Sequence, residues 1–127
     1  MQQPGKIIRL TAHARIAPSL VTFGTITKAS RATAVVDPRH YKVEFENERV
    51  RVVRIKYGPG EKSVMHSHPE SVAVFLTDAH AKFTYPDGRT EDINANVGTV
   101  QHMDAFTHLP ESLSNTPFEV IQVEWKR

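Results

Sequence analysis

From Tyr41 onward the sequence is divided into short segments in which apolar and polar residues alternate, and turn-forming residues separate these segments. Gly58-Pro59-Gly60 ends one segment, and Pro86-Asp87-Gly88 joins two others in the pattern of a hairpin turn. No segment shows the helical periodicity of an amphipathic helix. The pattern therefore predicts a single all-β domain of about eight to ten short strands, arranged as a sandwich or a barrel.

The alternation also places the individual strands. They are expected at residues 41–46, 49–57, 63–68, 72–77, 81–85, 89–94, 99–103, 107–109 and 118–125. Within residues 49–57 the apolar positions change parity between Val52 and Val53, which predicts a bulge or a change of packing partner. Residues 7–10 and 20–26 are further strand candidates.

The net charge of +2 is unevenly distributed along the chain. Residues 1–36 carry five basic and no acidic residues, whereas residues 37–127 carry 11 basic and 14 acidic residues. We therefore divide the chain into a basic N-terminal arm, residues 1–36, and a mildly acidic β-domain, residues 37–127. An acidic domain lacks the basic stripe of a nucleic-acid-binding protein, and no run approaches the roughly 20 apolar residues of a membrane helix.

The arm has two interpretations. Its acid-poor composition with Arg and Ser is typical of an organelle transit peptide. The other interpretation is an ordinary extension that adds an edge strand or contacts a partner subunit. We favour the extension and a cytoplasmic location, with an organelle-targeted or processed form as the alternative. The absence of cysteine fits either redox environment and excludes thiolate ligands.

His66 and His68 lie two residues apart in a segment that is expected to be extended. Side chains at positions i and i+2 of a strand point to the same face, so the two imidazoles would lie side by side. Such a pair begins a metal site only if a third ligand converges on it. His108 is the candidate third ligand. A histidine pair on a strand is often just part of a polar face. The interpretation of this pair as a metal site therefore depends on the surrounding sequence.

Two stretches around these histidines resemble the sequence motifs of the cupin superfamily. Gly60-x5-His66-x-His68, followed by an apolar segment, is similar to the first motif, and residues 98–108 are similar to a degenerate second motif. The resemblance extends from about Tyr41 to Trp125. It implies a double-stranded β-helix, the cupin or jelly-roll barrel, with a metal ion at its centre.

The resemblance implies that His66, His68 and His108 bind this metal. The family's usual glutamate ligand comes four residues after the second histidine, where this chain has Val72, which cannot bind a metal. Three interpretations follow. The three histidines bind a metal whose remaining positions hold water, Glu70 supplies a replacement oxygen ligand, or the site has lost its metal.

Other residues near the two motifs are candidates for supporting roles. His102 is expected on the strand that enters the second motif, where it is a fourth nitrogen ligand or a general base if it points inward, and a surface residue otherwise. Glu111 follows His108 by three residues, so it is a candidate to orient that imidazole or to act in catalysis. Five large apolar residues are expected to line the barrel and its core: Met65, Phe75, Phe83, Met103 and Phe106.

Three neutral imidazoles would leave a divalent ion with a net charge of about +2, which favours an anionic organic substrate. Iron would permit dioxygenase chemistry, whereas zinc, nickel or manganese would act as a Lewis acid, as in an isomerase. The sequence thus predicts a metal-binding small cupin that acts on, or binds, a small organic molecule. The alternative is a metal-free or structural-metal cupin that binds a small ligand or serves as a dimeric scaffold.

The family resemblance also implies a homodimer. Small cupins commonly pair their sheets and exchange N-terminal strands, and residues 20–26 are the candidate exchanged strand.

Overall fold

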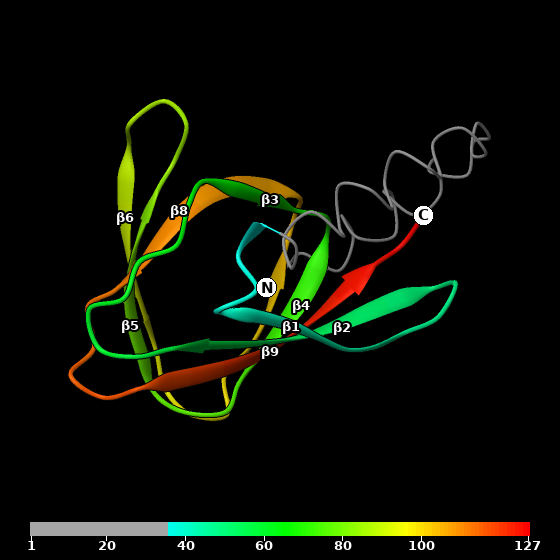
Figure 1. Ribbon diagram of the computed structural model, residues 1–127, viewed down its shortest axis with the longest axis horizontal. Coiled ribbons are helices and arrows are strands. Elements are labelled where there is room, and N and C mark those ends of the chain that lie inside the picture. Colours follow the sequence, from blue (N-terminus) through cyan, green and yellow to red (C-terminus); the bar gives the residue numbers. More distant parts are fainter. Residues whose placement is uncertain (1–35) are drawn as a thin grey trace.

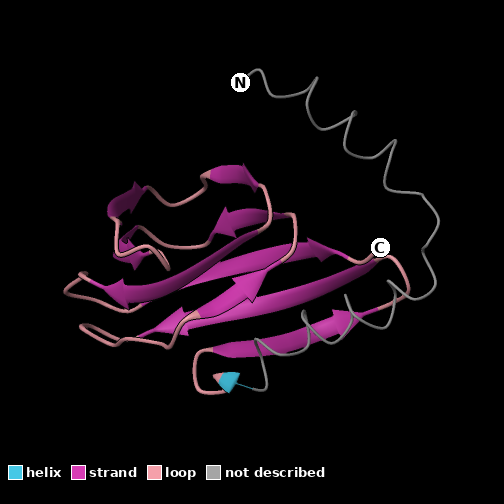
Figure 2. Cartoon of the chain, turned by 90° about the horizontal axis from the view of Figure 1, so that it is seen from above, coloured by secondary structure: helices cyan, strands magenta, loops and turns pink. Residues whose placement is uncertain are grey.

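The computed structural model describes residues 36–127, which form two antiparallel sheets around a shared interior (Figures 1 and 2). One sheet has the strand order β1-β2-β9-β4-β7, and the other has the order β3-β8-β5-β6. The strands are β1 (Tyr41–Glu46), β2 (Val50–Tyr57), β3 (His66–His68), β4 (Ser71–Phe75), β5 (Ala79–Thr84), β6 (Thr90–Ala95), β7 (Val100–Met103), β8 (Phe106–Ser112) and β9 (Phe118–Trp125). The all-β prediction is confirmed.

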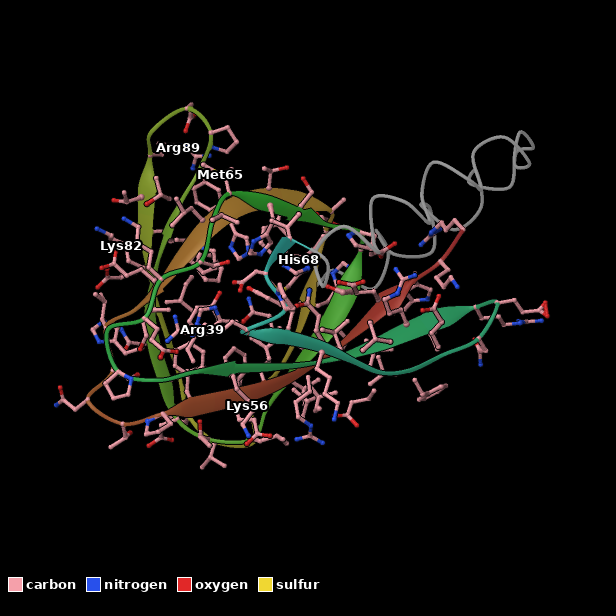
Figure 3. The ribbon with its side chains drawn as sticks, in the orientation of Figure 1. Arg39, Lys56, Met65, His68, Lys82 and Arg89 are labelled. Atoms are coloured by element: carbon pink, nitrogen blue, oxygen red, sulfur yellow. The ribbon has the colours of Figure 1, made fainter. Side chains whose placement is uncertain are left out.

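Some predictions concern residues outside the described part of the chain. The arm up to residue 35, with its strand candidates at 7–10 and 20–26, lies outside the described residues. Within residues 36–127, no helix is long and apolar enough to cross a membrane. Charged side chains such as Lys82 and Arg89 lie on the outside of the molecule (Figure 3).

Two strands differ most from their predicted bounds. β3 begins at His66 rather than at Ser63, and β8 continues through Pro110 to Ser112 rather than ending at Leu109. The carbonyl oxygen of Pro110 accepts a hydrogen bond of 3.0 Å from the amide of Ser63, so the polar backbone groups of Pro110 face the segment that precedes β3. The missing N–H of the proline therefore interrupts no pairing with β5 on the other side.

The parity change in β2 has a different cause from the predicted one. β2 pairs with β9 without interruption from Val50 to Tyr57, and the irregularity in this sheet lies in β1, between Val43 and Phe45. Val53 and Tyr57 point into the core, whereas Val52 has the opposite parity and is only half-buried. The apolar residues of β2 thus face both sides of the sheet.

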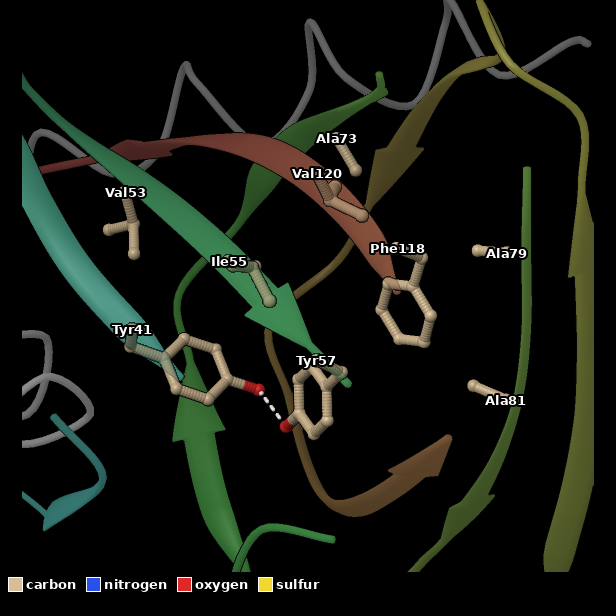
Figure 4. Close-up of a cluster of buried hydrophobic side chains, with 9 residues drawn as sticks. All are labelled: Tyr41, Val53, Ile55, Tyr57, Ala73, Ala79, Ala81, Phe118 and Val120. Atoms are coloured by element: carbon tan, nitrogen blue, oxygen red, sulfur yellow. Dashed lines mark hydrogen bonds between the residues drawn. The ribbon is translucent and has the colours of Figure 1, made fainter. Parts of the chain in front are cut away.

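The core fills the interior between the sheets at one end. Tyr57 stacks on Phe118 with ring centroids 5.2 Å apart, and its hydroxyl group shares a 2.8 Å hydrogen bond with that of Tyr41 (Figure 4). The ring of Tyr41 also contacts His66, at a centroid distance of 4.9 Å. The core and the histidine pair therefore form one continuous interior. Its buried apolar residues are Tyr41, Val53, Ile55, Tyr57, Ala73, Ala79, Ala81, Phe118 and Val120.

The outer face of the five-stranded sheet carries a row of mostly apolar side chains. The registers align one row of side chains across all five strands: Phe45, Val52, Val123, Val72 and His102. The two neighbours of Val72, Ser71 and Ala73, are buried at 0% and 3% exposure, whereas Val72 is half-buried. Because successive residues of a strand point to opposite faces, Val72 points away from the interior.

This arrangement makes two adjacent valines a matched pair. Val53→Ala should lower the free energy of unfolding by about 2–3 kcal/mol, because it removes two buried methyl groups and leaves a cavity. Val52→Ala, the control, should cost less than about 1 kcal/mol because its side chain is only half-buried. Urea unfolding of both variants measures the difference, and equal losses would contradict the assignment of the two faces.

Candidate metal centre

Antiparallel pairing of β3 with β8 brings the three histidines together. His66 lies directly opposite His108, and His68 lies two residues further along β3 on the same face. The ring centroids of the three imidazoles are 4.8, 4.9 and 5.3 Å apart. One nitrogen from each ring lies within 4.8 Å of the others, and all three side chains are buried. In Figure 3, His68 lies in the interior.

Hydrogen bonds fix the orientation of two of these rings. Nδ1–H of His66 donates to the carbonyl oxygen of Val64 over 2.8 Å, since a carbonyl can only accept. Nδ1 of His68 lies 3.0 Å from a carboxylate oxygen of Glu124 and donates to it in the same way. With the proton on Nδ1, the Nε2 atom of each neutral ring carries a free lone pair, which is the form that binds metals.

Three buried ring nitrogens in this cluster have no hydrogen-bond partner among the described residues. They are Nε2 of His66 and both nitrogens of His108. Buried polar atoms are nearly always paired, because leaving one unpaired costs about 1–3 kcal/mol. A metal ion bound to Nε2 of His66 and to one nitrogen of His108 would satisfy two of these three atoms, so the residues fit the metal that the family resemblance implies.

Burial and the neighbouring histidines favour the neutral form of His66 and His108. Burial, and then the nearby His68, lower the pKa of His66 to about 4. Burial, followed by His68 and His66, lowers the pKa of His108 to about 2. Both rings are therefore unprotonated near pH 7, as metal coordination requires.

Glu124 is a functional candidate that the sequence analysis missed. It is fully buried on β9, and its second oxygen lies 4.0 Å from the guanidinium of Arg51, which is also fully buried. Arg51 donates in turn to both oxygens of Glu46, at 3.2 and 2.8 Å. Behind His68, charges of alternating sign thus run outward from Glu124 through Arg51 to Glu46. The signal in the sequence was an acidic residue on the buried parity of an otherwise alternating strand.

The structure places Glu70 and His102 apart from the three histidines. A ring nitrogen of His102 lies 2.7 Å from one oxygen of Glu70, and Arg127 binds the other oxygen. Glu70 shares the parity of Val72, which faces outward, and His102 lies opposite Val72 on β7. With Asp104 they form a separate group of potential ligands. The geometry thus gives no support to Glu70 or His102 as a fourth ligand to the three-histidine cluster.

Two other predicted roles also find no support. Glu111 lies 3.6 Å from Lys82, and neither ring nitrogen of His108 has a hydrogen bond to any residue from 36 to 127. Met65 is 40% exposed because β3 begins only after it, so it does not line the barrel. The other four predicted lining residues do line an interior cavity: Phe75, Phe83, Met103 and Phe106.

The lowered pKa values of His66 and His108 predict how stability depends on pH. Because both groups bind protons more readily in the unfolded chain, the metal-free protein should lose stability as the pH falls below about 6.5, by about 1.4 kcal/mol per pH unit for each histidine. Urea unfolding between pH 7 and 4.5, with a chelator present, measures this slope. His108→Gln should show a shallower slope, and an unchanged slope would contradict the assignment.

Comparison with known proteins supports the fold. No protein-family model matches the sequence, and no curated protein matches it. A cupin domain from Bordetella pertussis Tohama I matches 68% of this chain and 92% of its own, with 25% sequence identity and a TM-score of 0.64. An RmlC-like cupin from Methanocaldococcus jannaschii, described as a double-stranded β-helix, covers 68% of this chain and 78% of its own, with 14% identity and a TM-score of 0.53.

A further structure agrees with these two. A double-stranded β-helix protein from Klebsiella pneumoniae covers 68% of this chain and 75% of its own, with 18% identity and a TM-score of 0.55. The matched structures share the two-sheet architecture that surrounds the histidine cluster here. The chain therefore has the double-stranded β-helix fold and belongs, as a small domain, to the cupin superfamily.

Proposed function

We propose that this cupin binds one divalent transition-metal ion through His66, His68 and His108 and uses it to bind and transform a small organic molecule. The observation that carries the proposal is the set of unpaired, buried ring nitrogens that converge in the interior. Three protein ligands are typical of catalytic zinc sites, because they leave a coordination position open for water or substrate. Iron, zinc, nickel and manganese all accept imidazole ligands.

When bound, such an ion would act as a Lewis acid or, if it were iron, as a centre for oxygen chemistry. The chain's own residues have simpler tasks. The backbone of Val64 and the carboxylate of Glu124 hold two imidazoles in the metal-binding tautomer. Phe106, stacked on His68 with centroids 5.3 Å apart, and Phe83, 4.3 Å from the ring centroid of His108, keep water from the inner side of the cluster.

Elemental analysis of untagged protein tests the metal site. We expect about one equivalent of a transition metal in the wild type and its loss in His66→Ala and His108→Ala. The reason is that two remaining protein ligands rarely bind an ion tightly enough to retain it during purification. His80→Ala is the control, because His80 lies on β5 outside the cluster and its side chain is 40% exposed. Full metal content in both cluster variants would overturn the proposal.

The same measurement separates the two kinds of function. One equivalent of iron would lead to oxygen-consumption assays, and zinc, nickel or manganese would lead to isomerisation and hydrolysis assays. Wild-type protein that neither retains a metal nor takes one up on addition would leave a metal-free ligand-binding or scaffold protein as the alternative.

A second prediction concerns the carboxylate behind His68. Glu124→Gln should weaken metal binding by about 10–100-fold, because the neutral amide lowers the basicity of the ligand and no longer favours the Nδ1–H tautomer. Titration with cobalt(II), followed by absorption spectroscopy, measures the affinity. Glu119→Gln is the matched control, since Glu119 lies on the same strand and contacts Arg54 on the outer face. Equal affinities of the two variants would show that Glu124 has no such role.

A further inference from the structure

An interior cavity of about 70 Å³ lies beside two of the three histidines. His68 and His108 form part of its wall, and core residues such as Tyr57 and Phe118 form another part. Most of the remaining wall is apolar and includes Phe83, which also contacts His108. A molecule in this cavity would thus touch the metal centre with one end and apolar side chains with the rest.

Three polar side chains of the wall, besides the histidines, are hydrogen-bonded within the protein. The hydroxyl groups of Tyr41 and Tyr57 bond to each other over 2.8 Å, and the side-chain amide of Gln122 donates to the hydroxyl oxygen of Ser71 over 2.8 Å. Among the described residues that line the cavity there is no Asp, Glu, Lys or Arg. A charged group on the body of a ligand would therefore find no side chain of opposite charge there, which would make its burial costly.

The end of the cavity beside the histidines, in contrast, requires a charged group on the ligand. Three imidazoles bring no negative charge to a divalent ion. Within residues 36–127, Glu124 is the one carboxylate that is hydrogen-bonded to a ligand residue, and it also faces the guanidinium of Arg51 at 4.0 Å. An ion in a mainly apolar cavity is stable only if opposite charge is close to it. The missing negative charge must then come from the bound molecule itself.

The volume limits the size of this molecule. An apolar cavity of about 150 Å³ is large enough for benzene, which has six carbon atoms. By the same scale, a cavity of about 70 Å³ accommodates a body of about three non-hydrogen atoms.

We propose that the barrel binds a small organic monoanion, whose charged end lies at the histidine cluster and whose short, uncharged apolar body fills the cavity beside Phe83 and Phe106. This inference rests on the metal site of the proposed function. It selects against dianions, zwitterions and long chains, because each would place a charge or excess volume against the apolar wall.

Three molecules of equal size test the inference on the cobalt(II)-loaded full chain. Butyrate is a monoanion with an apolar body, butyramide is its neutral counterpart, and 3-aminopropionate replaces the terminal methyl group with an ammonium group. Absorption titrations should show butyrate binding at least tenfold more tightly than either of the others. Equal binding of 3-aminopropionate or butyramide, or no binding of butyrate, would overturn the inference while leaving the metal site intact.

A variant tests the location. Ala81 lines the cavity and is 4% exposed, so Ala81→Val should narrow the cavity, weaken butyrate about tenfold and leave acetate unchanged. Ala95→Val is the control, because Ala95 lies on the neighbouring strand β6 and does not line the cavity. Equal loss of acetate and butyrate, or equal effects of the two substitutions, would contradict the assigned cavity. The number of cobalt ions bound per chain, measured in parallel, shows separately whether the metal site itself has failed. The comparison of the three molecules uses the wild-type chain, so it does not depend on the folding of either variant.

Discussion

The pairing of β3 with β8 is the constraint on which the candidate centre depends. β3 has only three residues, and two of them are histidines that face the interior. Its register with β8 sets His66 opposite His108. A slip of one residue would turn both histidines of β3 outward and bring Ser67 inward. The short strand therefore needs neighbours that hold it in place, and Ser67 and Thr107 share a hydrogen bond of 2.7 Å on the outer side of this pair.

The buried charges behind His68 are the costly part of the structure. Arg51 and Glu124 are both fully buried, and one atom of each lacks a hydrogen bond among the described residues. Replacing such a pair by apolar residues often stabilises a protein, so its presence is weak evidence for stability. The contact between Glu124 and His68 indicates that the pair of Arg51 and Glu124 supports the candidate metal site instead. A carboxylate that orients a metal-binding imidazole has to be buried beside it, and Arg51 then compensates for part of its charge.

Much of this arrangement could be predicted from the sequence. Alternation and turn residues were sufficient for the strands, and two motifs were sufficient for the three histidines, because both signals are local or nearly so. The direction of Val72 was not predictable, since it depends on where β4 begins relative to its neighbours. The role of Glu124 was not predictable either, because it depends on β9 running beside β4, which joins segments far apart in the chain.

The position of the histidines in the sequence has a consequence for how the protein acquires its ion. His68 and His108 are separated by 40 residues and meet only after β3 has paired with β8. Contacts between distant segments form late in folding, because closing the intervening loop costs chain entropy before any contact repays it. The cluster of three imidazoles therefore exists only in the native state. An ion bound there closes that loop, and by mass action it favours the native state over every less folded form of the chain.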